Sequence, residues 1–160
     1  MHLLLHKLPL GWRFHRVHHS ELEADVTTAF RQHPGETLWR SLWQCIGTVA
    51  FGLPFWVLPV YLSLSSLNAL LEHANLRVHE SVDRFLRLLI VTPNMHKIHH
   101  SRVADETDSN YSNIFSVWDR LFGTYTRRPE YQTLSYGLDR SDSKQKQRLK
   151  ELIIEPFRRA

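Results

Sequence analysis

The longest apolar segment of the chain covers residues 41–71 and contains no Asp, Glu, Lys or Arg. Its 31 residues exceed the roughly 20 that cross a bilayer once as a helix, and fall short of the roughly 40 needed for two crossings. Gly52, Pro54 and Pro59 interrupt the segment near its middle, where they disfavour a continuous helix. We therefore expect a hairpin over residues 42–71 that enters a membrane and returns to the same side. The alternative is a buried core helix of a soluble protein.

The rest of the pattern is typical of helices separated by polar loops, and no segment alternates convincingly as a strand does. The sequence therefore predicts an all-α fold. One helix is expected at residues 1–20, with an interruption near Pro9 and Gly11, and another from Thr37 onward, after Pro34 and Gly35. A third is expected at 81–92, with an apolar face of Val82, Phe85, Leu86 and Leu89. A short helix is expected just before Gly123, and a last one at 141–157 with Ser141 as the N-cap. We expect a histidine-rich domain over residues 1–127 and a polar C-terminal tail with a helix over residues 128–160.

Composition excludes several classes of protein. Cys45 is the only cysteine, so neither a disulfide within the chain nor a cysteine metal cluster can form. The formal net charge of +4 is mild and suits contact with an anionic membrane surface. No dense basic stripe with interleaved aromatic residues is present, so a nucleic-acid partner is not expected.

The pattern His-x-x-His-His-Ser occurs twice, in "FHRVHHS" at residues 14–20 and in "MHKIHHS" at residues 95–101. Positions i, i+3 and i+4 share one face of a helix, so each triplet would project its imidazoles together. Neutral imidazole is the commonest metal ligand among side chains. The two triplets, His15, His18 and His19 with His96, His99 and His100, therefore predict a site for more than one metal ion. A solvated basic face or a pH-sensitive patch is the alternative.

A third pair, His2 and His6, has the i, i+4 spacing of one helical face. Zinc proteases share this spacing, but there a glutamate follows the first histidine as the general base. Here Leu3, Leu4 and Leu5 lie between the two histidines, which excludes the protease pattern.

If both triplets bind one metal cluster, they must lie on the same side of the membrane, which is a second reason to expect a hairpin between them. Arginines flank the apolar segment on both sides, and an excess of Lys and Arg marks the cytoplasmic side of membrane segments. These arginines are Arg13, Arg16, Arg31 and Arg40 before the segment, and Arg77, Arg84 and Arg87 after it. The metal site is therefore expected on the cytoplasmic face.

With these motifs in place, the sequence resembles the fatty acid hydroxylase and sterol desaturase superfamily of membrane enzymes. The resemblance covers roughly the first four-fifths of the chain. The residues that carry it are "HLLLH" at 2–6, "WRFHRVHHS" at 12–20, "EHAN" at 72–75, "TPNMHKIHHS" at 92–101 and "NYSNIFSVWDRLFGTY" at 110–125. Members of this superfamily usually carry membrane helices before the first histidine box, whereas His2 directly follows Met1 here. A fragment, a sequence with a misplaced start or a truncated relative is therefore expected.

The resemblance implies an oxygen-dependent diiron enzyme that oxidises a membrane lipid, a fatty acyl chain or a sterol-like substrate. It implies two iron ions, O₂ as co-substrate and an electron-donor protein of unknown type as a partner. The implied metal ligands are His2, His6, His15, His18, His19, His73, His79, His96, His99 and His100. His33 also matches a position of the family, but one that is not counted as a ligand.

Imidazole suits iron, zinc, copper and nickel alike, but zinc lacks the redox chemistry that oxidation of an aliphatic C–H bond with O₂ requires. Asp105, Glu106 and Asp108 follow the second triplet and could orient imidazole N–H groups, or could form a solvated loop. Asn110 and Asp119 have the same two interpretations. Trp118, Leu121 and Phe122 are expected to pack the metal domain, because apolar residues at helical spacing usually belong to a core.

Two functional hypotheses remain. The first is a lipid hydroxylase or desaturase, and the second is a non-catalytic, membrane-associated metal-binding relative. A soluble hydrolytic dimetal enzyme would need carboxylates among its ligands, and none lies within the histidine motifs.

Overall fold

The computed structural model describes residues 1–128, 133–138 and 143–158. These residues form helices and loops, and the only strand-like pairing among them is one antiparallel bridge between Ser101 and Tyr136. The prediction of an all-α fold is confirmed for this part of the chain. In chain order the helices are α1 (His2–Lys7), α2 (Pro9–His19), η1 (Val26–Phe30), α3 (Pro34–Ala50), α4 (Val57–His73), α5 (Glu80–Leu86), α6 (Pro93–His99), α7 (Ala104–Thr107), α8 (Val117–Leu121), α9 (Leu149–Ile154) and η3 (Glu155–Phe157).

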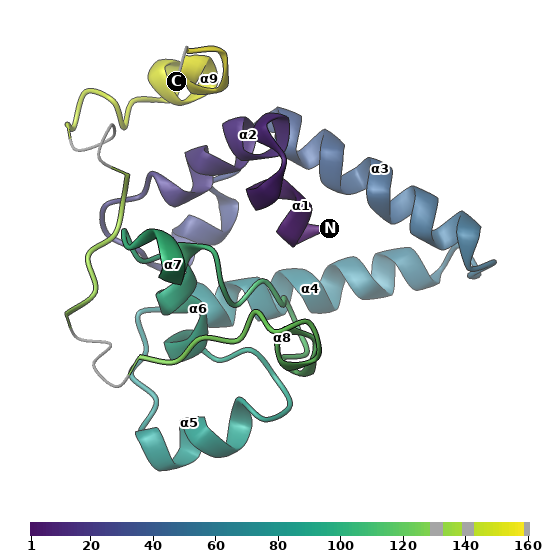
Figure 1. Ribbon diagram of the computed structural model, residues 1–160. Helices are drawn as coiled ribbons and strands as arrows, with labels where there is room; N and C mark the ends of the chain where they lie inside the picture. Colours follow the sequence, from purple (N-terminus) through teal and green to yellow (C-terminus); the bar gives the residue numbers. More distant parts are fainter. Residues whose placement is uncertain (129–132, 139–142, 159–160) are drawn as a thin grey trace.

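The apolar segment forms a helical hairpin, as its central glycine and prolines predict. Helices α3 and α4 are the two longest, and they converge at a turn that lies far from the other helices (Figure 1). Gly52 has a φ of 60° in this turn, a conformation that glycine adopts without steric cost. Each of the two helices has 17 residues, and within the described residues no helix combines the length and hydropathy needed to span a bilayer.

Helix α3 starts at Pro34, three residues before the predicted Thr37, because a histidine caps it. The Nδ1 atom of His33 accepts a hydrogen bond from the Gly35 amide at 2.9 Å, and Pro34 occupies a position where a missing N–H costs nothing. The first turn of α3 is thus fixed beside the first histidine triplet.

The predicted helix over residues 1–20 divides at Leu8, whose backbone is extended, and Pro9 starts the next helix. This break folds α1 back onto α2. The two helices approach so closely at Gly11 that a Cβ atom there would lie 2.8 Å from the Leu5 Cα. His2 and His6 on α1 are thereby held against the triplet of α2.

The second triplet lies on α6, which packs against α4. The helix expected at residues 81–92 is shorter, because α5 ends at Leu86. Pro93 is the first residue of α6, and Thr92 caps this helix by accepting a hydrogen bond from the Met95 amide at 3.2 Å.

The C-terminal tail returns to the histidine-rich domain. Glu155 lies 3.4 Å from Arg16 of α2, and the Ile153 carbonyl accepts a hydrogen bond from His33 Nε2 at 3.1 Å. The last predicted helix is shorter than expected and consists of α9 followed by η3. Its predicted N-cap, Ser141, lies outside the described residues.

The core is unusually polar. Buried apolar side chains are few, whereas buried histidines, carboxylates, serines and threonines occupy most of the interior. The buried apolar residues of the described chain are Leu5, Val17, Ala29, Val91, Met95, Ile98 and Tyr111. Polar side chains therefore occupy most of the fully buried positions in the described part of the chain.

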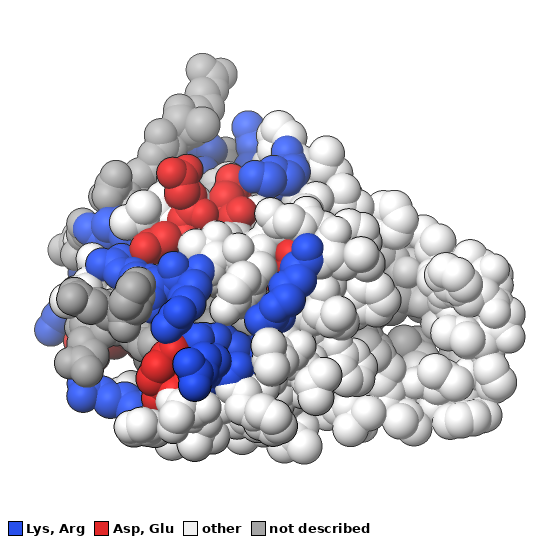
Figure 2. All heavy atoms as spheres, turned by 60° about the horizontal axis from the view of Figure 1, so that its bottom comes forward, with Lys and Arg blue, Asp and Glu red and all other residues white. Residues whose placement is uncertain are grey.

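The apolar side chains of two short helices point outward, contrary to one prediction. Trp118, Leu121 and Phe122 are 52%, 68% and 70% exposed, so the expectation that they pack the metal domain is wrong. On α5, Val82 and Phe85 are also exposed. The space-filling view shows Lys, Arg, Asp and Glu gathered at one end of the molecule, with a large uncharged surface at the other end (Figure 2).

We expect that Gly11→Ala destabilises the protein by about 1–3 kcal/mol, because the added methyl group would overpack the contact between α1 and α2. Gly47→Ala is the matched control, since no atom lies within 4 Å of a Cβ at this position in α3. That substitution should stabilise α3 by about 0.5–1 kcal/mol. Denaturant unfolding followed by circular dichroism in detergent measures both changes. Equal effects of the two substitutions would contradict the close approach at Gly11.

Candidate dimetal site

Nine of the 11 histidines converge in two neighbouring groups. Within each group one ring nitrogen per histidine lies within 4.8 Å of the corresponding nitrogens of the others. The first group contains His2, His6, His15, His19 and His99, and the second contains His18, His73, His96 and His100. All except His2 are buried.

Each triplet contributes to both groups. From α2, His15 and His19 enter the first group and His18 enters the second. From α6 and the residue after it, His99 enters the first group, while His96 and His100 enter the second. The two triplets therefore face one another, and the centroids of the His18 and His100 rings lie 4.6 Å apart. The other histidines of the two groups come from α1 and from the last residue of α4.

Hydrogen bonds at Nδ1 orient most of these rings. For six histidines Nδ1 contacts a carbonyl or carboxylate oxygen, so the proton resides on Nδ1 and the Nε2 lone pair points into the group. The contacts are His2 to the Tyr111 carbonyl (2.8 Å), His6 to Asp108 (3.3 Å), His15 to Glu36 (2.9 Å), His18 to the Arg31 carbonyl (3.2 Å), His73 to the Ala69 carbonyl (2.7 Å) and His99 to the Ser109 carbonyl (2.7 Å).

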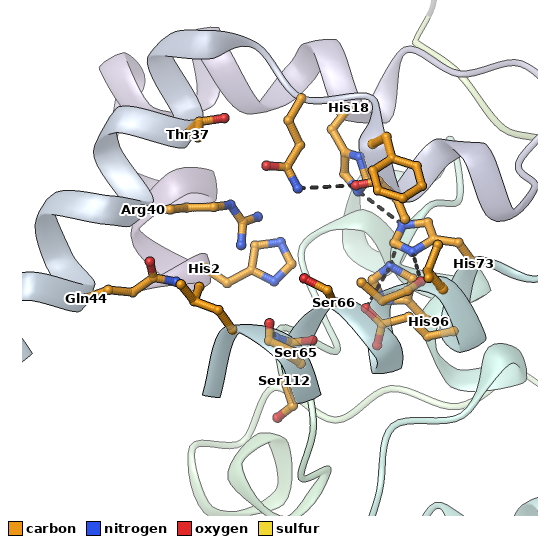
Figure 3. A pocket seen from close by; sticks show the side chains of 18 of the residues that line it. His2, His18, Thr37, Arg40, Gln44, Ser65, Ser66, His73, His96 and Ser112 are labelled. Atoms are coloured by element: carbon orange, nitrogen blue, oxygen red, sulfur yellow. Dashed lines mark hydrogen bonds and ion pairs between the residues drawn. The ribbon is translucent and has the colours of Figure 1, made fainter. Parts of the chain in front are cut away.

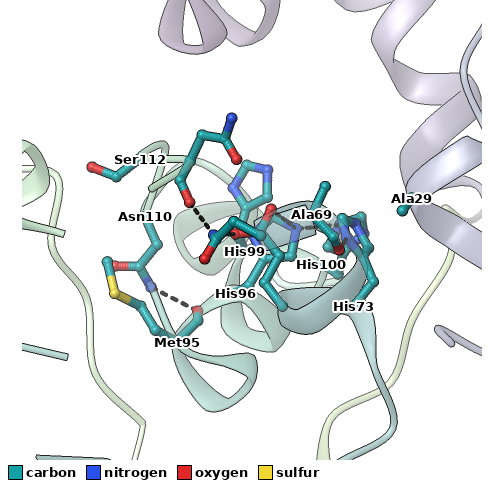
Figure 4. A network of polar contacts seen from close by, with 12 residues as sticks. Ala29, Ala69, His73, Met95, His96, His99, His100, Asn110 and Ser112 are labelled. Carbon is teal, nitrogen blue, oxygen red and sulfur yellow. Dashed lines mark hydrogen bonds and ion pairs between the residues drawn. The ribbon is translucent and has the colours of Figure 1, made fainter. Parts of the chain in front are cut away.

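The Nε2 atoms are spaced as ligands of a metal ion are. Those of His73, His96 and His100 lie 3.1 Å from one another in all three pairs (Figure 4). Because His73 already donates from Nδ1, its Nε2 atom can only accept, and three mutual contacts cannot all be hydrogen bonds. A metal ion bound to nitrogen at about 2.0–2.1 Å sets neighbouring ligand nitrogens about 2.8–3.4 Å apart, from octahedral to tetrahedral angles. The observed triangle fits that geometry.

The first group shows the same fit. The Nε2 atoms of His2 and His15 lie 2.9 Å apart, and those of His15 and His19 lie 3.2 Å apart. The Nε2 atoms of His6 and His99 are buried without a hydrogen-bond partner. Buried polar atoms are rarely left unsatisfied, and bound metal would satisfy all of these.

Burial keeps the imidazoles neutral. It is the main cause that lowers the pKa of every histidine in the two groups, with further lowering from neighbouring rings or from Arg40. The pKa of His73 falls to about 4 and that of His99 to about 3. Neutral imidazole is the form that binds metal, so the site is ready to bind metal at neutral pH.

Two buried glutamates lie beside the histidines, and the motifs did not indicate a role for either. Glu36, in the first turn of α3, accepts from His15 Nδ1 at 2.9 Å and from Arg40 Nε at 2.7 Å. Burial tends to raise its pKa, but His15 and Arg40 outweigh burial and hold the pKa below its usual range. The one available signal was the i, i+4 spacing of Glu36 and Arg40 at the border of the uncharged segment.

Glu72 is the second buried acid, and its Oε1 atom lies 3.8 Å from His96 Nε2. Its Oε2 atom accepts a hydrogen bond from Asn68 at 3.1 Å. Burial raises the pKa of Glu72 well above its usual value, so the neutral carboxyl group is favoured there.

The acidic residues that follow the second triplet have different roles. Asp108 contacts both His6 and Lys7, the latter at 2.7 Å, so it can orient one imidazole. Glu106 instead pairs with Arg128 at 3.0 Å, and the exposed Asp105 has no contact with a histidine in the described part of the chain. Of the two interpretations, Asp108 fits the orientation of an imidazole, whereas Glu106 and Asp105 do not contact a histidine within the described residues.

Asp119 and Asn110 hold the loop that carries the Tyr111 carbonyl. The Asp119 carboxylate accepts from the amides of Tyr111 and Ser112, at 2.7 and 3.0 Å. Asn110 has a φ of 50° and donates to the Met95 carbonyl at 3.2 Å (Figure 4). Both side chains are fully buried and act on the backbone rather than on an imidazole.

The remaining two histidines do not join either group. His79 is exposed and caps α5, with Nδ1 2.8 Å from the Ser81 hydroxyl, so the structure does not support the prediction that it is a ligand. The physical reason is that α4 ends at His73, and the following loop carries His79 to the start of α5 at the surface. His33 is the N-cap of α3.

A cavity of about 490 Å³ opens beside the histidines, between α3 and α4. Its volume lies in the range of small-molecule sites. His2, His18, His73 and His96 line one part of it (Figure 3). Polar and apolar side chains line the rest, among them Thr37, Gln44, Ser66, Phe30 and Leu62. A ligand in this cavity would therefore reach both histidine groups.

Comparison with known proteins agrees with this site. The pattern of the fatty acid hydroxylase family matches residues 1–124. The chain is 33% identical over 137 residues to the alkylglycerol monooxygenase of Danio rerio, covering 86% of this chain and 29% of the relative. It is also 33% identical over 140 residues to the ornithine lipid hydroxylase of Rhizobium tropici, covering 86% of this chain and 40% of the relative.

The alkylglycerol monooxygenase of Homo sapiens is 29% identical over 139 residues, again covering 86% of this chain and 29% of the relative. The chain thus spans less than half the length of these relatives. No solved structure matches it significantly. The family match includes all nine histidines of the two groups, and it covers most of the chain. The chain belongs to the fatty acid hydroxylase family.

Proposed function

We propose that this protein hydroxylates a membrane lipid with O₂, using two iron ions held by the two histidine groups. The observation that carries the proposal is the spacing of the Nε2 atoms, which suits one metal ion per group. The names of the relatives, a monooxygenase and a lipid hydroxylase, support hydroxylation over desaturation as the outcome.

Bound iron would supply the O₂ activation that oxidation of an aliphatic C–H bond requires. The overall reaction consumes one C–H bond, one O₂ molecule, two electrons and two protons, and gives one C–OH group and one water. The two electrons would come from a donor protein.

The residues of this chain then have separate roles. The nine histidines would be the ligands, and the carbonyls of residues 31, 69, 109 and 111 fix four of their rings through Nδ1. Glu36 holds the His15 ring and increases its basicity as a ligand. Glu72 borders the cavity and can hold a proton on its carboxyl group close to His96.

We further propose that the hairpin enters the membrane from the cytoplasmic side. The uncharged residues 42–71 form its two arms, and many of their apolar side chains are exposed, including Phe51, Phe55 and Trp56. Such a surface is costly in water and favourable in a bilayer. Of the flanking arginines, Arg13, Arg77 and Arg84 are exposed, whereas Arg16 and Arg87 are buried in ion pairs. The lipid substrate would then reach the cavity along the hairpin.

Metal analysis of variants tests the proposal directly. The protein isolated from membranes should contain about two iron atoms per chain, because the two groups are separate coordination spheres. His18→Ala removes a ligand of the second group and His99→Ala a ligand of the first. Each should lower the iron content by at least one atom and abolish lipid oxidation with a reductant and O₂.

His79→Ser is the matched control, because it removes an imidazole but keeps a side chain that can cap α5. It should retain both iron and activity. Unchanged iron content in His18→Ala and His99→Ala would refute the assignment of ligands. Full iron content in the unaltered protein without any oxygen-dependent product would favour the non-catalytic alternative.

Glu36→Gln should weaken metal binding at the first group by about 10–100-fold, the usual effect of losing a carboxylate that orients a histidine ligand. Iron retention against a graded series of chelator concentrations measures this change. Glu106→Gln is the control, because Glu106 pairs with Arg128 and contacts no histidine. An equal loss of iron in both variants would contradict the proposed role of Glu36.

The metal-free protein should lose stability as the pH falls below about 6.5. His73 and His99 have a folded-state pKa of about 4 and about 3, below the unfolded value of 6.5, so the unfolded chain binds more protons in this range. Each of these two histidines should lower the free energy of unfolding by about 2 kcal/mol between pH 7 and pH 5. Melting temperatures of the chelator-treated protein at pH 7, 6 and 5 test this, and a constant melting temperature would contradict it.

A further inference from the structure

Arg40 places a positive charge inside the cavity beside the histidines. It is the only Lys or Arg among the described residues that line this cavity. Its side chain extends from α3 toward His2 (Figure 3) and is 23% exposed. Glu72 is the only Asp or Glu in the described lining, and it lies beside His96. Arg40 is therefore the one Lys or Arg side chain that this lining offers to a ligand, and it is paired with Glu36 through its Nε atom.

The guanidinium group of Arg40 is fixed at one edge and open at the other. Its Nε atom donates to the buried Glu36 carboxylate at 2.7 Å, one helical turn away on α3. Neither Nη atom forms a hydrogen bond with any described residue. The two Nη atoms thus present a preorganised fork of donors to the cavity, the geometry that binds a carboxylate or phosphate with two hydrogen bonds.

Uncharged polar side chains surround this fork. Ser41 and Gln44 on α3 and Ser66 on α4 line the same cavity, and their side chains form no hydrogen bond within the described part of the chain. Such groups can bind hydroxyl or amide groups next to an anionic centre. A purely hydrocarbon ligand would leave these donors and the arginine unsatisfied, at a cost in affinity.

A second, mostly apolar cavity lies on the hairpin, closer to its turn. It has a volume of about 310 Å³, and it shares Gln44 with the polar cavity. Trp43, Val57, Leu58 and Tyr61 are among its lining residues. A lipid chain in this cavity would point away from the histidines, and its polar end would lie near Arg40.

We infer that Arg40 binds the anionic head group of the lipid substrate, a carboxylate or a phosphate, so that oxidation takes place on a carbon close to the head group. This inference rests on the proposed function, because it assigns a substrate class to the same site. Arg40 is a substrate-binding residue in this account, and its contact with Glu36 positions it.

Binding to the zinc-loaded protein tests the recognition without any turnover, because zinc has no redox chemistry. The three probes are hexadecanoic acid, hexadecyl phosphate and hexadecanol, which share one chain and differ in head group. Quenching of tryptophan fluorescence in a non-ionic detergent gives the dissociation constants. We expect at least one of the anionic probes to bind about 10-fold or more tightly than the alcohol, and the stronger of the two identifies the head group as carboxylate or phosphate.

Arg40→Gln should weaken binding of the preferred anion about 10–100-fold and leave hexadecanol within about 2-fold. The affinity of Arg40→Lys for the preferred anion should lie between those of the unaltered protein and Arg40→Gln, because lysine keeps the charge but lacks the two Nη donors. Arg77→Gln, which removes the same charge outside the cavity, is the control and should bind all three probes as the unaltered protein does. Equal binding of the acid, the phosphate and the alcohol, or an equal loss for all probes in Arg40→Gln, would overturn the inference.

Turnover separates this inference from the proposed function. With iron, a reductant and O₂, the preferred anionic probe should be hydroxylated within a few carbons of its head group, as mapped by mass spectrometry. Hydroxylation in the middle or at the far end of the chain would overturn the inference and leave the proposed function intact. A preserved head-group preference without any product would refute the proposed function and support Arg40 as an anion-binding residue.

Discussion

The fold depends on burying nine imidazoles whose Nε2 atoms face one another. Each neutral ring has one donor and one acceptor, so such a cluster cannot satisfy itself with hydrogen bonds alone. The structure resolves part of this conflict by directing Nδ1–H groups of six rings outward to carbonyls and carboxylates. What remains is a set of convergent lone pairs, which a bound metal ion would satisfy. The scarcity of buried apolar side chains makes this arrangement more important for stability than it would be in an ordinary hydrophobic core.

The spacing of the triplets explains how two short helices build two sites. Residues i and i+4 lie almost above one another on a helix, while residue i+3 is displaced around the axis. On α2 the pair His15 and His19 therefore enters one group and His18 the other. On the second triplet the pair His96 and His100 enters one group and His99 the other. Each group therefore combines a pair of histidines from one triplet with the single histidine of the other triplet. The repeated motif supplies three histidines to each group, and His2, His6 and His73 complete the two groups.

Several features could be predicted from the sequence because they depend on local periodicity. The triplets indicated shared helical faces, and the uncharged residues 41–71 with a central Gly52 indicated the hairpin. Features that depend on tertiary approach could not be predicted in the same way. Glu36 contacts His15, 21 residues away, only because α3 folds back onto α2. Trp118 has helical spacing like a core residue, but periodicity does not reveal whether the apolar face meets protein or its surroundings.

The supports of the histidine rings differ in how much sequence change they tolerate. Four of the six Nδ1 contacts are made to main-chain carbonyls, those of Arg31, Ala69, Ser109 and Tyr111. A carbonyl oxygen is present whatever the side chain, so these positions can drift in evolution as long as the local backbone is preserved. Only Glu36 and Asp108 act through side chains. The chemical identity of the site is thus encoded in very few residues beyond the histidines, and relatives can diverge widely around it while keeping the same centre.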